Sequence, residues 1–581
     1  MAEIFSRIKL NTRQIVATML FVVIAAIAQM VIPSLLSKMI DDGVSGNKAG
    51  LVVGIGIAMI VISVFACALQ VVATRLVATI TTKFSADLRK ELFYKIQSFS
   101  AANIDRFGTA SLITRNTTDV SMIQNFMSQL LGVGLLAPIT AVVGLVLSVA
   151  FSGKIAVVIA IAVPVLLIVV TLLIIGTSRY STKLRRKIDD INQLFLETLE
   201  GVRVIRAFNK QENEINRFEA TNAETASISQ KSISMSGWMF PTVNMIFGIT
   251  FVGAMVMGTA LVVNGDIEVG ALVAATQYIA MILLSIIMMS HVISLFPDAY
   301  ACMKRIGEVL KTEVSIKDST KETPRKTCRG TVEFRNVTFA YPGADAPVIK
   351  GISFVSGPGE TTAIIGRTGC GKSSIVKLVP RLYDTLFGEV LVDGVNVRDY
   401  KLEELRNLIG YVPQKNVLFS GDIASNLNFG NDNGGEKEWK EAARIACAAE
   451  FVEKKEGVFH SPVAQGGTNF SGGQRQRLAI ARAVMKKPEV YIFDDSFSAL
   501  DMKTDRQLRK NLKESMGDAT MIVVAQRVNT IMDATRILVL EDGEVVGMGT
   551  HRELLKSCRL YREITEIQLG EKEVENEIAR A

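Results

Sequence analysis

The sequence predicts two domains: a membrane domain of six helices, followed by a soluble domain in which strands and helices alternate. Composition is the first reason, because 581 residues with a mean hydropathy of +0.31 and 49% hydrophobic residues are too many for one domain and too apolar for a purely soluble protein. The second reason is the distribution of apolar and charged residues along the chain. Long charge-free segments occupy the first half, whereas short β-branched runs alternate with helical patterns in the second half.

Six segments lack Asp, Glu, Lys and Arg, and each is long enough to cross a hydrocarbon core of about 30 Å, which takes about 20 helical residues. They are residues 14–37, 49–74, 127–153, 155–178, 232–265 and 271–297. The first is similar to a secretory signal, because small residues follow its apolar run. It is longer than a typical signal core and five more segments follow, so we interpret it as the first span.

The connections between these segments alternate between short and long. Residues 75–126 carry seven Lys and Arg and residues 179–231 carry ten, whereas the three short connections carry two, one and none. The positive-inside rule therefore predicts that the long connections, both termini and everything after Pro297 are cytoplasmic. Apolar residues at helical spacing predict that the long connections continue the membrane helices into the cytoplasm, with a solvated connector as the alternative.

Composition also predicts the domain boundaries. We expect a transmembrane domain over residues 1–297, with six helices and two long cytoplasmic helical loops. A linker is expected over residues 298–329, because its sequence is rich in charge and threonine. The soluble domain then occupies residues 330–581.

A phosphate-binding pattern lies in the soluble domain. Residues 366–373 read GRTGCGKS and match G-x-x-x-x-G-K-[ST], with a predicted strand before and a predicted helix after. The glycines allow backbone N–H groups to converge on phosphate oxygens at a helix N-terminus, Lys372 supplies a charge to the β- and γ-phosphates, and Ser373 can bind Mg²⁺. We therefore predict a nucleotide site. Its loop comprises Gly366, Arg367, Thr368, Gly369, Cys370, Gly371, Lys372, Ser373 and Ser374.

Two carboxylates end another predicted strand. In EVYIFDDSFSALD, residues 489–501, Asp494 follows the apolar run VYIF and is predicted to reach the magnesium ion. Asp495 comes next, where a carboxylate can hold the attacking water. Between the two motifs, residues 469–483 read NFSGGQRQRLAIARA, which taken alone predicts a Ser-Gly turn capping a basic helix.

Together these motifs resemble the ATP-binding cassette, and with the six spans the whole chain resembles a half-transporter of the ABC exporter family. The resemblance implies an α-helical six-span transmembrane domain followed by an α/β P-loop nucleotide-binding domain, with ATP and Mg²⁺ as cofactors. It also implies a dimer in which each ATP lies between the P-loop of one chain and the signature of the other. The signature residues here are Ser471, Gly472, Gly473 and Gln474.

Further segments match the family one by one. Tyr341 in FAYPG resembles the aromatic residue that stacks on adenine, and Gln414 in GYVPQ resembles the glutamine that touches the metal and senses the transmembrane domain. Asp501 ends SALD, which resembles the loop that crosses between two ATPase domains. Residues 104–109 and 200–208 resemble the coupling helices that dock on those domains.

Two residues that the family uses for ATP hydrolysis differ in this chain. Asp495 stands where the family has its general-base glutamate, and Gln526 stands where it has its switch histidine. An aspartate is one methylene shorter, so its oxygen stands back by about 1 Å, and such a misplacement costs about a hundredfold in rate. Glutamine cannot carry the charge of a histidine. We predict weak hydrolysis at this chain's own site and main hydrolysis at the site of a different partner chain.

An intact signature combined with altered hydrolytic residues resembles the degenerate-site subunit of heterodimeric bacterial ABC multidrug exporters. Three alternatives remain open: an active homodimer that tolerates Asp495, an ATP-gated channel, and an importer built on the exporter fold. The expected partners are a second half-transporter chain, the lipid bilayer of the cell membrane and a small-molecule substrate. Because the spans lack charge, we expect a hydrophobic or amphipathic substrate.

The net charge of +7 is explained by the cytoplasmic loops, so no nucleic-acid partner is expected. The six cysteines contain no C-x-x-C pair, which predicts neither a zinc site nor a disulfide framework. Cys370 lies near a predicted helix N-terminus and Lys372, so we expect its thiol to be more reactive than the others, unless the loop backbone shields it.

Overall fold

The computed structural model describes residues 12–151, 153–319, 328–572 and 574–575, and it divides into two compact units. The first unit comprises the chain up to Gln97 together with Thr109–Thr312. The second comprises Ser98–Gly108 together with the chain from Glu313 onward. A short segment between the second and third predicted spans therefore belongs to the unit built mainly from the second half of the chain.

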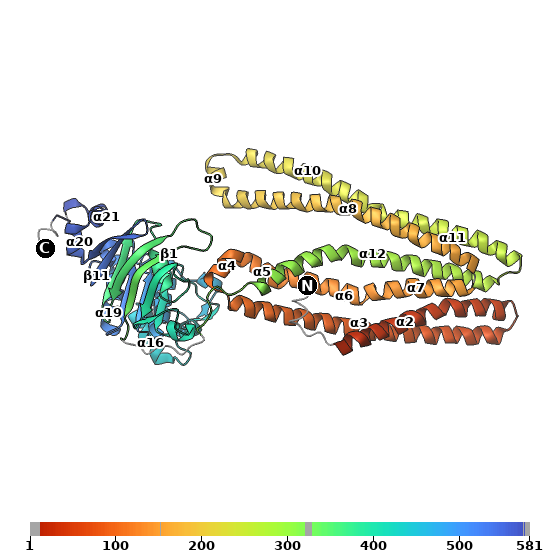
Figure 1. Ribbon diagram of the computed structural model, residues 1–581, viewed down its shortest axis with the longest axis horizontal. Coiled ribbons are helices and arrows are strands. Elements are labelled where there is room, and N and C mark those ends of the chain that lie inside the picture. Colours follow the sequence, from red (N-terminus) through yellow and green to blue (C-terminus); the bar gives the residue numbers. More distant parts are fainter. Residues whose placement is uncertain (1–11, 152, 320–327, 573, 576–581) are drawn as a thin grey trace. The chain divides into compact units, whose positions relative to one another are not determined.

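Within the described residues, the first unit contains six helical segments that are long and apolar enough to cross a membrane, as the sequence predicts (Figure 1). Their elements are α2 (Thr12–Lys38), η1 (Met39–Val44), α3 (Ala49–Gln97), α5 (Thr109–Thr114), η2 (Arg115–Asp119), α6 (Val120–Leu131), α7 (Val133–Phe151), α8 (Gly153–Glu200), α9 (Val202–Ala207), α10 (Gln211–Gly237), α11 (Met239–Val263) and α12 (Val269–Lys311).

The longest helices run well beyond a membrane core. The helices α3 and α8 contain 49 and 48 residues, which is roughly 70 Å at 1.5 Å per residue. This confirms the prediction that the long connections continue the membrane helices. Ion pairs join the extension of α8 to α10, with Lys187 Nζ 2.9 Å from Glu224 and Arg217 3.2 Å from Glu197. Figure 1 shows α9 connecting the ends of these two helices.

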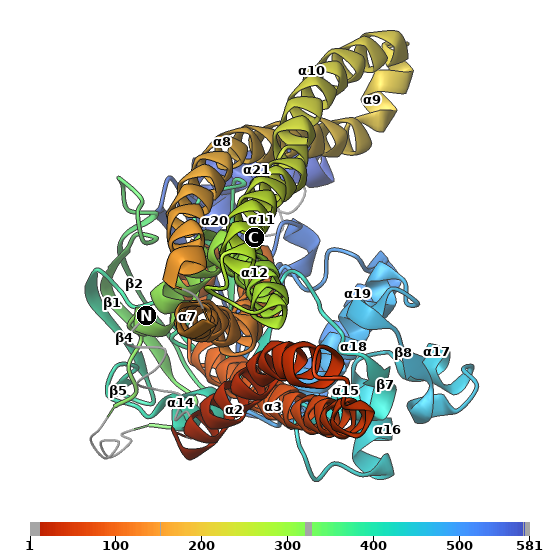
Figure 2. The same cartoon turned by 90° about the vertical axis from the view of Figure 1, so that its right-hand side faces the viewer.

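The spans pack in pairs. Seen end-on, α2 lies beside α3, α7 beside α12, and α8 beside α11 (Figure 2). The hydroxyl of Tyr278 in α12 donates to the carbonyl of Met30 in α2 at 2.9 Å. Near the end of α12, Arg305 donates two hydrogen bonds to Asp119, of 2.8 and 2.6 Å, and the Asp119 side chain is only 3% exposed. These two contacts pair buried polar groups of this unit across helices.

The predicted linker differs from the structure in its first part, because residues 298–311 continue α12 as far as Lys311. Apolar positions recur at helical spacing within this charged stretch and are buried, so its charges occupy the remaining positions. The buried residues are Ala299, Cys302, Met303, Ile306, Val309 and Leu310. Residues 320–327 of the predicted linker lie outside the described residues.

The second unit contains two main sheets. The antiparallel sheet has the order β2-β1-β4-β5, with β1 (Val332–Phe339), β2 (Ile349–Ser356), β4 (Phe387–Val392) and β5 (Val395–Asn396). The second has the order β12-β11-β3-β10-β9-β6, with β3 (Thr361–Gly366), β6 (Ile409–Val412), β9 (Val490–Asp494), β10 (Thr520–Val524), β11 (Arg536–Glu541) and β12 (Glu544–Gly549). A small sheet pairs β7 (Gly421–Asp422) with β8 (Pro462–Val463).

Helices and short turns complete this unit. They are α4 (Ala101–Phe107), α13 (Lys372–Leu378), α14 (Leu402–Asn407), α15 (Ile423–Asn428), α16 (Glu436–Ile445), α17 (Ala449–Glu453), η3 (Val458–His460), η4 (Gln465–Gly467), α18 (Gly472–Met485), α19 (Met502–Ser515), η5 (Val528–Thr530), α20 (His551–Ser557) and α21 (Arg559–Leu569). The six-stranded sheet is buried on both faces, because alternate residues of β3 enter different apolar clusters: Ala363 and Ile365 one, Ile364 the other.

Strand order positions the candidate site. Strands β3 and β9 both pair in parallel with β10, which lies between them. Parallel strands end at the same edge of a sheet, so Gly366 at the end of β3 and Asp494 at the end of β9 are brought close together.

Candidate nucleotide-binding site

The phosphate loop connects β3 to α13, and its glycines are required by close backbone contacts. A Cβ on Gly366 would lie 2.2 Å from the carbonyl oxygen of Leu540. Gly371 has φ +98 and a Cβ there would lie 2.9 Å from the carbonyl oxygen of Val348. Only glycine fits both requirements, so the loop can wrap tightly before the first turn of α13.

The loop's side chains differ in exposure. Arg367, Thr368 and Gly369 are exposed, whereas Cys370 and Ser374 are buried. The ammonium of Lys372 donates to the carbonyl oxygens of Gly366 and Arg367, at 2.8 Å each, which places its charge over the loop. Both acceptors are neutral, so no carboxylate within this loop neutralises the lysine.

Two of the three predicted metal ligands are in direct contact. The Ser373 hydroxyl donates to Asp494 Oδ1 at 2.7 Å, and the Tyr411 hydroxyl lies 3.4 Å from Asp494 Oδ2. A hydroxyl and a carboxylate meeting at a phosphate loop form the oxygen donor set that Mg²⁺ prefers, so these residues fit the implied cofactor. Gln414, the third predicted ligand, is exposed and its amide is 3.4 Å from the neighbouring carboxylate, Asp495 Oδ2.

The two residues that depart from the family pattern contact each other. Gln526 Nε2 donates to Asp495 Oδ2 at 2.8 Å, and Gln414 approaches the same oxygen. Asp495 is 9% exposed and adopts a left-handed backbone conformation with φ +51. Burial raises the pKa of Asp495 above its ordinary value; the hydrogen bond from Gln414 opposes this rise and the charge of Asp494 adds to it.

Sequence reasoning missed the contact between Asp495 and Gln526. It singled out both residues, but it treated them as separate departures. A signal existed, because Asp495 directly follows β9 and Gln526 lies two residues after β10. Those strands are neighbours in the parallel sheet, so their following residues meet at one edge. The strand order needed for that inference comes from the tertiary structure.

The signature forms an exposed helix N-terminus. Ser471 is the N-cap of α18, its hydroxyl accepts from Gln474 N at 3.3 Å, and Gln474 Oε1 accepts from Ser471 N at 3.0 Å. This reciprocal capping box leaves Ser471 and Gly472 exposed. A Cβ on Gly473 would lie 3.1 Å from the carbonyl oxygen of Ala499. Among the described residues, no hydrogen bond or ion pair joins the signature to the phosphate loop.

Tyr341, the predicted adenine-stacking residue, lies beside the phosphate-loop helix. Its hydroxyl is 2.9 Å from the hydroxyl of Ser374. Asp501, the predicted crossing-loop residue, is the N-cap of α19 and accepts from Thr504 N at 3.1 Å. Tyr341 is therefore held against α13, and Asp501 caps the helix that follows it.

The two predicted coupling segments have different environments. The first overlaps α4, which begins at Ala101, earlier than predicted, and packs within the second unit. Ala101 and Ala102 contact the apolar cluster beneath the antiparallel sheet. The second segment contains α9, in which none of the residues is buried, and the following Phe208 is 73% exposed.

Of the two expectations for Cys370, the structure agrees with the one in which the loop backbone shields the thiol. Its side chain is only 7% exposed, and a Cβ on Gly366 would lie 2.9 Å from its Sγ, so the loop's own backbone covers the thiol. Cys558 is similarly buried, at 6%, whereas Cys67 and Cys328 are exposed. The described cysteines are all free, and no group of ligands suitable for a metal cluster occurs among the described residues.

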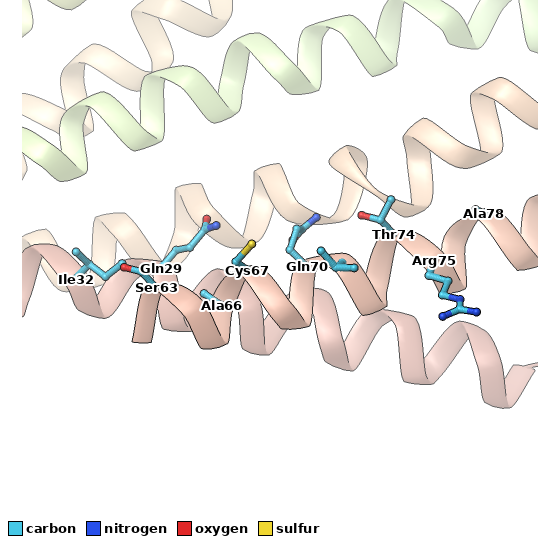
Figure 3. A pocket seen from close by; sticks show the side chains of 10 residues that line it. Gln29, Ile32, Ser63, Ala66, Cys67, Gln70, Thr74, Arg75 and Ala78 are labelled. Carbon is cyan, nitrogen blue, oxygen red and sulfur yellow. The ribbon is translucent and has the colours of Figure 1, made fainter. Parts of the chain in front are cut away.

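The first unit contains a pocket of about 640 Å³ along α3 and α2 (Figure 3). In Figure 3, the side chains of Gln29, Cys67, Gln70 and Thr74 point to the same side, and Arg75 points away from them. Residues 63, 67, 70 and 74 recur at helical spacing on one face of α3. The lining residues are Gln29, Ile32, Ser63, Ala66, Cys67, Gln70, Val71, Thr74, Arg75 and Ala78.

Both units of the chain match known protein families. Residues 15–287 match the ABC transporter transmembrane region, and residues 349–498 match the ABC transporter family. The chain is 37% identical to an uncharacterized ABC transporter ATP-binding protein of Mycobacterium tuberculosis, over 96% of each chain. It is 34% identical to another such protein, YfiB of Bacillus subtilis, over 93% of each chain.

Two further likenesses are informative. A Staphylococcus aureus protein whose name refers to multidrug export is 28% identical, over 96% of this chain and 97% of its own. A solved bacterial Atm1-family ABC exporter with ATP bound has a TM-score of 0.81 at 24% identity, covering 96% of this chain and 99% of that one. The six-span helical unit and the ATP-binding unit define an ABC transporter with the exporter fold. The chain belongs to the ABC transporter family.

Proposed function

We propose that this chain is one half of a heterodimeric ABC exporter whose own phosphate loop forms a slow ATP site. The observation that carries the proposal is the hydrogen bond between Asp495 and Gln526, beside a signature helix that begins with an exposed capping box. The bond between Asp495 and Gln526 slows ATP hydrolysis at this chain's own phosphate loop. The exposed capping box leaves its signature suited to complete the site of another chain.

The geometry of the phosphate loop supports a set of proposed nucleotide-binding residues. The phosphate loop, residues 366–374, would hold the phosphates, with Lys372 supplying positive charge and Tyr341 the stacking surface for adenine. Ser373, Asp494 and Gln414 would hold Mg²⁺, which when bound neutralises charge on the phosphates. The contact of 2.7 Å between Ser373 and Asp494 supports this assignment, because it brings two oxygen donors to one point.

Slow hydrolysis follows from the position of the Asp495 carboxylate. Its side chain is one methylene shorter than a glutamate, and its Oδ2 accepts from Gln526 at 2.8 Å. Acting as a base requires a carboxylate oxygen within about 2.6–3.2 Å of the water that it polarises. An oxygen that stands back and is already hydrogen-bonded holds that water poorly. Gln526, as an amide, contributes no positive charge to the transition state.

The signature serves the opposite chain in this proposal. Ser471 and Gly472 are exposed at the N-terminus of α18, a helix of 14 residues, where backbone N–H groups and the helix dipole favour phosphate. The resulting pair would contain one slow site and one fast site. Two copies of this chain would contain two slow sites.

Orientation and substrate complete the proposal. The excess of Lys and Arg in residues 75–126 and 179–231 supports cytoplasmic loops, termini and ATP-binding domain. The relative whose name refers to multidrug export supports export of a small molecule. The pocket of α2 and α3 combines aliphatic residues with the amides of Gln29 and Gln70, which suits an amphipathic substrate with a hydrogen-bonding group.

The test compares this chain alone with the assembled pair in lipid nanodiscs. Alone, we expect Mg-ATP binding that Lys372→Ala weakens, with little turnover. Addition of a half-transporter chain that carries the glutamate and the histidine should restore ATP hydrolysis, and inside-out vesicles should then accumulate the substrate. Vigorous turnover by a homogeneous preparation of this chain would contradict the heterodimer proposal.

A further inference from the structure

Tyr383 is a buried tyrosine that none of the nucleotide-binding motifs includes. It lies between α13 and β4, and its side chain is 7% exposed. Its hydroxyl donates to Asp105 Oδ2 at 2.7 Å. Asp105 belongs to α4, the helix between the second and third spans. A residue of the ATP-binding fold therefore bonds directly to a segment that the chain connects to the membrane helices.

Tyr383 also contacts the candidate adenine site. Its ring meets the ring of Tyr341 edge-on, with centroids 5.2 Å apart and planes at 85°. This geometry is within the favourable range for aromatic pairs. Tyr341 in turn bonds through its hydroxyl to Ser374 of α13 at 2.9 Å. Four side chains thus form a continuous path from the phosphate-loop helix through two tyrosines to α4.

The Tyr383 hydroxyl is constrained to donate in one direction. Burial raises the pKa of Tyr383 above its ordinary value, and the hydrogen bond to the Asp105 carboxylate raises it further, so the phenol stays protonated. Its ring also packs against Phe339, with centroids 5.6 Å apart. A small displacement of the ring would therefore change the length or the angle of the bond to Asp105.

The helix α4 is attached to the chain beyond the last span as well. Asn103 Nδ2 donates to the carbonyl of Glu313 at 3.3 Å, and Asn103 Oδ1 accepts from Ser315 N at 3.2 Å. Glu313 lies two residues after the end of α12. By chain continuity, α4 is therefore connected to the spans that contain α3, α5 and α12.

We propose that Tyr383 is a positioning residue that transmits occupancy of the adenine site to α4. The inference rests on the proposed role of Tyr341 as the residue that stacks on adenine. A base stacked on Tyr341 restrains that ring, the edge-on contact then restrains Tyr383, and the hydroxyl is held against Asp105. Without a base, both rings have more freedom and the bond to α4 opens more often.

Hydrogen exchange followed by mass spectrometry tests this on the purified full chain in nanodiscs, with and without saturating Mg-ATP. The probes are the amides of Ile104 and Gly108, which donate within α4 to the carbonyls of Ser100 and Ile104. In the wild type, Mg-ATP should slow exchange in α4 by about fivefold or more. Tyr383→Phe removes only the hydroxyl and should abolish this slowing, while the affinity for Mg-ATP changes by less than about twofold.

Matched variants separate this role from simple packing. Tyr400 is a buried tyrosine of the same apolar cluster, and its hydroxyl donates to the carbonyl of Val392 at 3.0 Å. Tyr400→Phe should therefore retain the slowing of α4 by Mg-ATP. Asp105→Asn keeps an oxygen acceptor and should retain part of the slowing, whereas Asp105→Ala should remove it.

The outcomes distinguish this inference from the proposed function. Saturable Mg-ATP binding without slowing in the wild type, or full slowing in Tyr383→Phe, would overturn the role of Tyr383 while leaving the nucleotide site intact. Failure of the wild-type chain to bind Mg-ATP would overturn the nucleotide site and this role together. Loss of slowing in Tyr400→Phe as well would show that any disturbance of the cluster suffices, which also overturns the role.

Discussion

In the proposed slow site, a longer carboxylate and a histidine should together raise the rate of ATP hydrolysis. Asp495→Glu advances the carboxylate by about 1 Å, and correcting a misplacement of that size is worth about a hundredfold in rate, or about 2.7 kcal/mol in activation free energy. In the wild type, Gln526 Nε2 donates to Asp495 Oδ2 at 2.8 Å. Gln526→His removes that amide and supplies a side chain that can carry positive charge.

The two substitutions should be non-additive, because the residues are in contact. With Gln526 retained, Asp495→Glu should gain only part of the increase, since the amide can still hold the carboxylate. Gln526→His alone should gain little, because Asp495 remains too short. We expect the double variant to hydrolyse ATP about 100-fold faster than the wild type, more than the product of the two single effects.

The assay is single-turnover hydrolysis of ATP in the assembled transporter, with the phosphate-loop lysine of the partner replaced by alanine so that only this site turns over. Lys372→Ala in the double variant is the control and should remove the regained activity. If the double variant binds Mg-ATP as the wild type does yet hydrolyses it no faster, then Asp495 and Gln526 do not cause slow hydrolysis, and the reasoning is refuted.

Three further predictions concern the signature and phosphate loop, the Asp495 carboxyl group and the cysteines. Ser471→Ala should reduce ATP turnover of the proposed pair by about tenfold or more, since in that proposal Ser471 serves the fast site, whereas Lys372→Ala should reduce it only in part; the opposite order would mean that the two sites are reversed. Burial raises the pKa of Asp495, so the stability that its protonated form contributes is present below the ordinary value of 3.8 and is lost as the pH rises through the raised value. Asp495→Asn should therefore raise the melting temperature at pH 7 but not near pH 3, and an equal rise at both pH values would disprove this. A small maleimide should label Cys328, which is exposed in the second unit, faster than the buried Cys370, and mass spectrometry of both peptides would reveal the reverse order.

Particular elements show how far the sequence could lead. The six spans were predicted from charge-free segments, and the continuation of α3 and α8 beyond the membrane core was predicted from helical spacing. The structure of residues 298–311 is not predicted correctly. Their charged residues indicate an irregular linker, but buried positions continue α12 to Lys311. Local composition reports the average polarity of a segment, whereas burial of one face decides whether it stays helical.

Some residues of the candidate site can be identified from the sequence, whereas their contacts are found only in the structure. Glycine spacing, Lys372 and Ser373 identify a phosphate loop from sequence alone, because the chemistry of that loop is contained in eight consecutive residues. Only the tertiary structure brings Asp495 against Gln526, and Tyr383 between Tyr341 and Asp105. Residues 105 and 383 are far apart in the chain, and no periodicity encodes their contact. Such contacts depend on strand order and on helix docking, which are decided by how the whole chain buries its apolar surface.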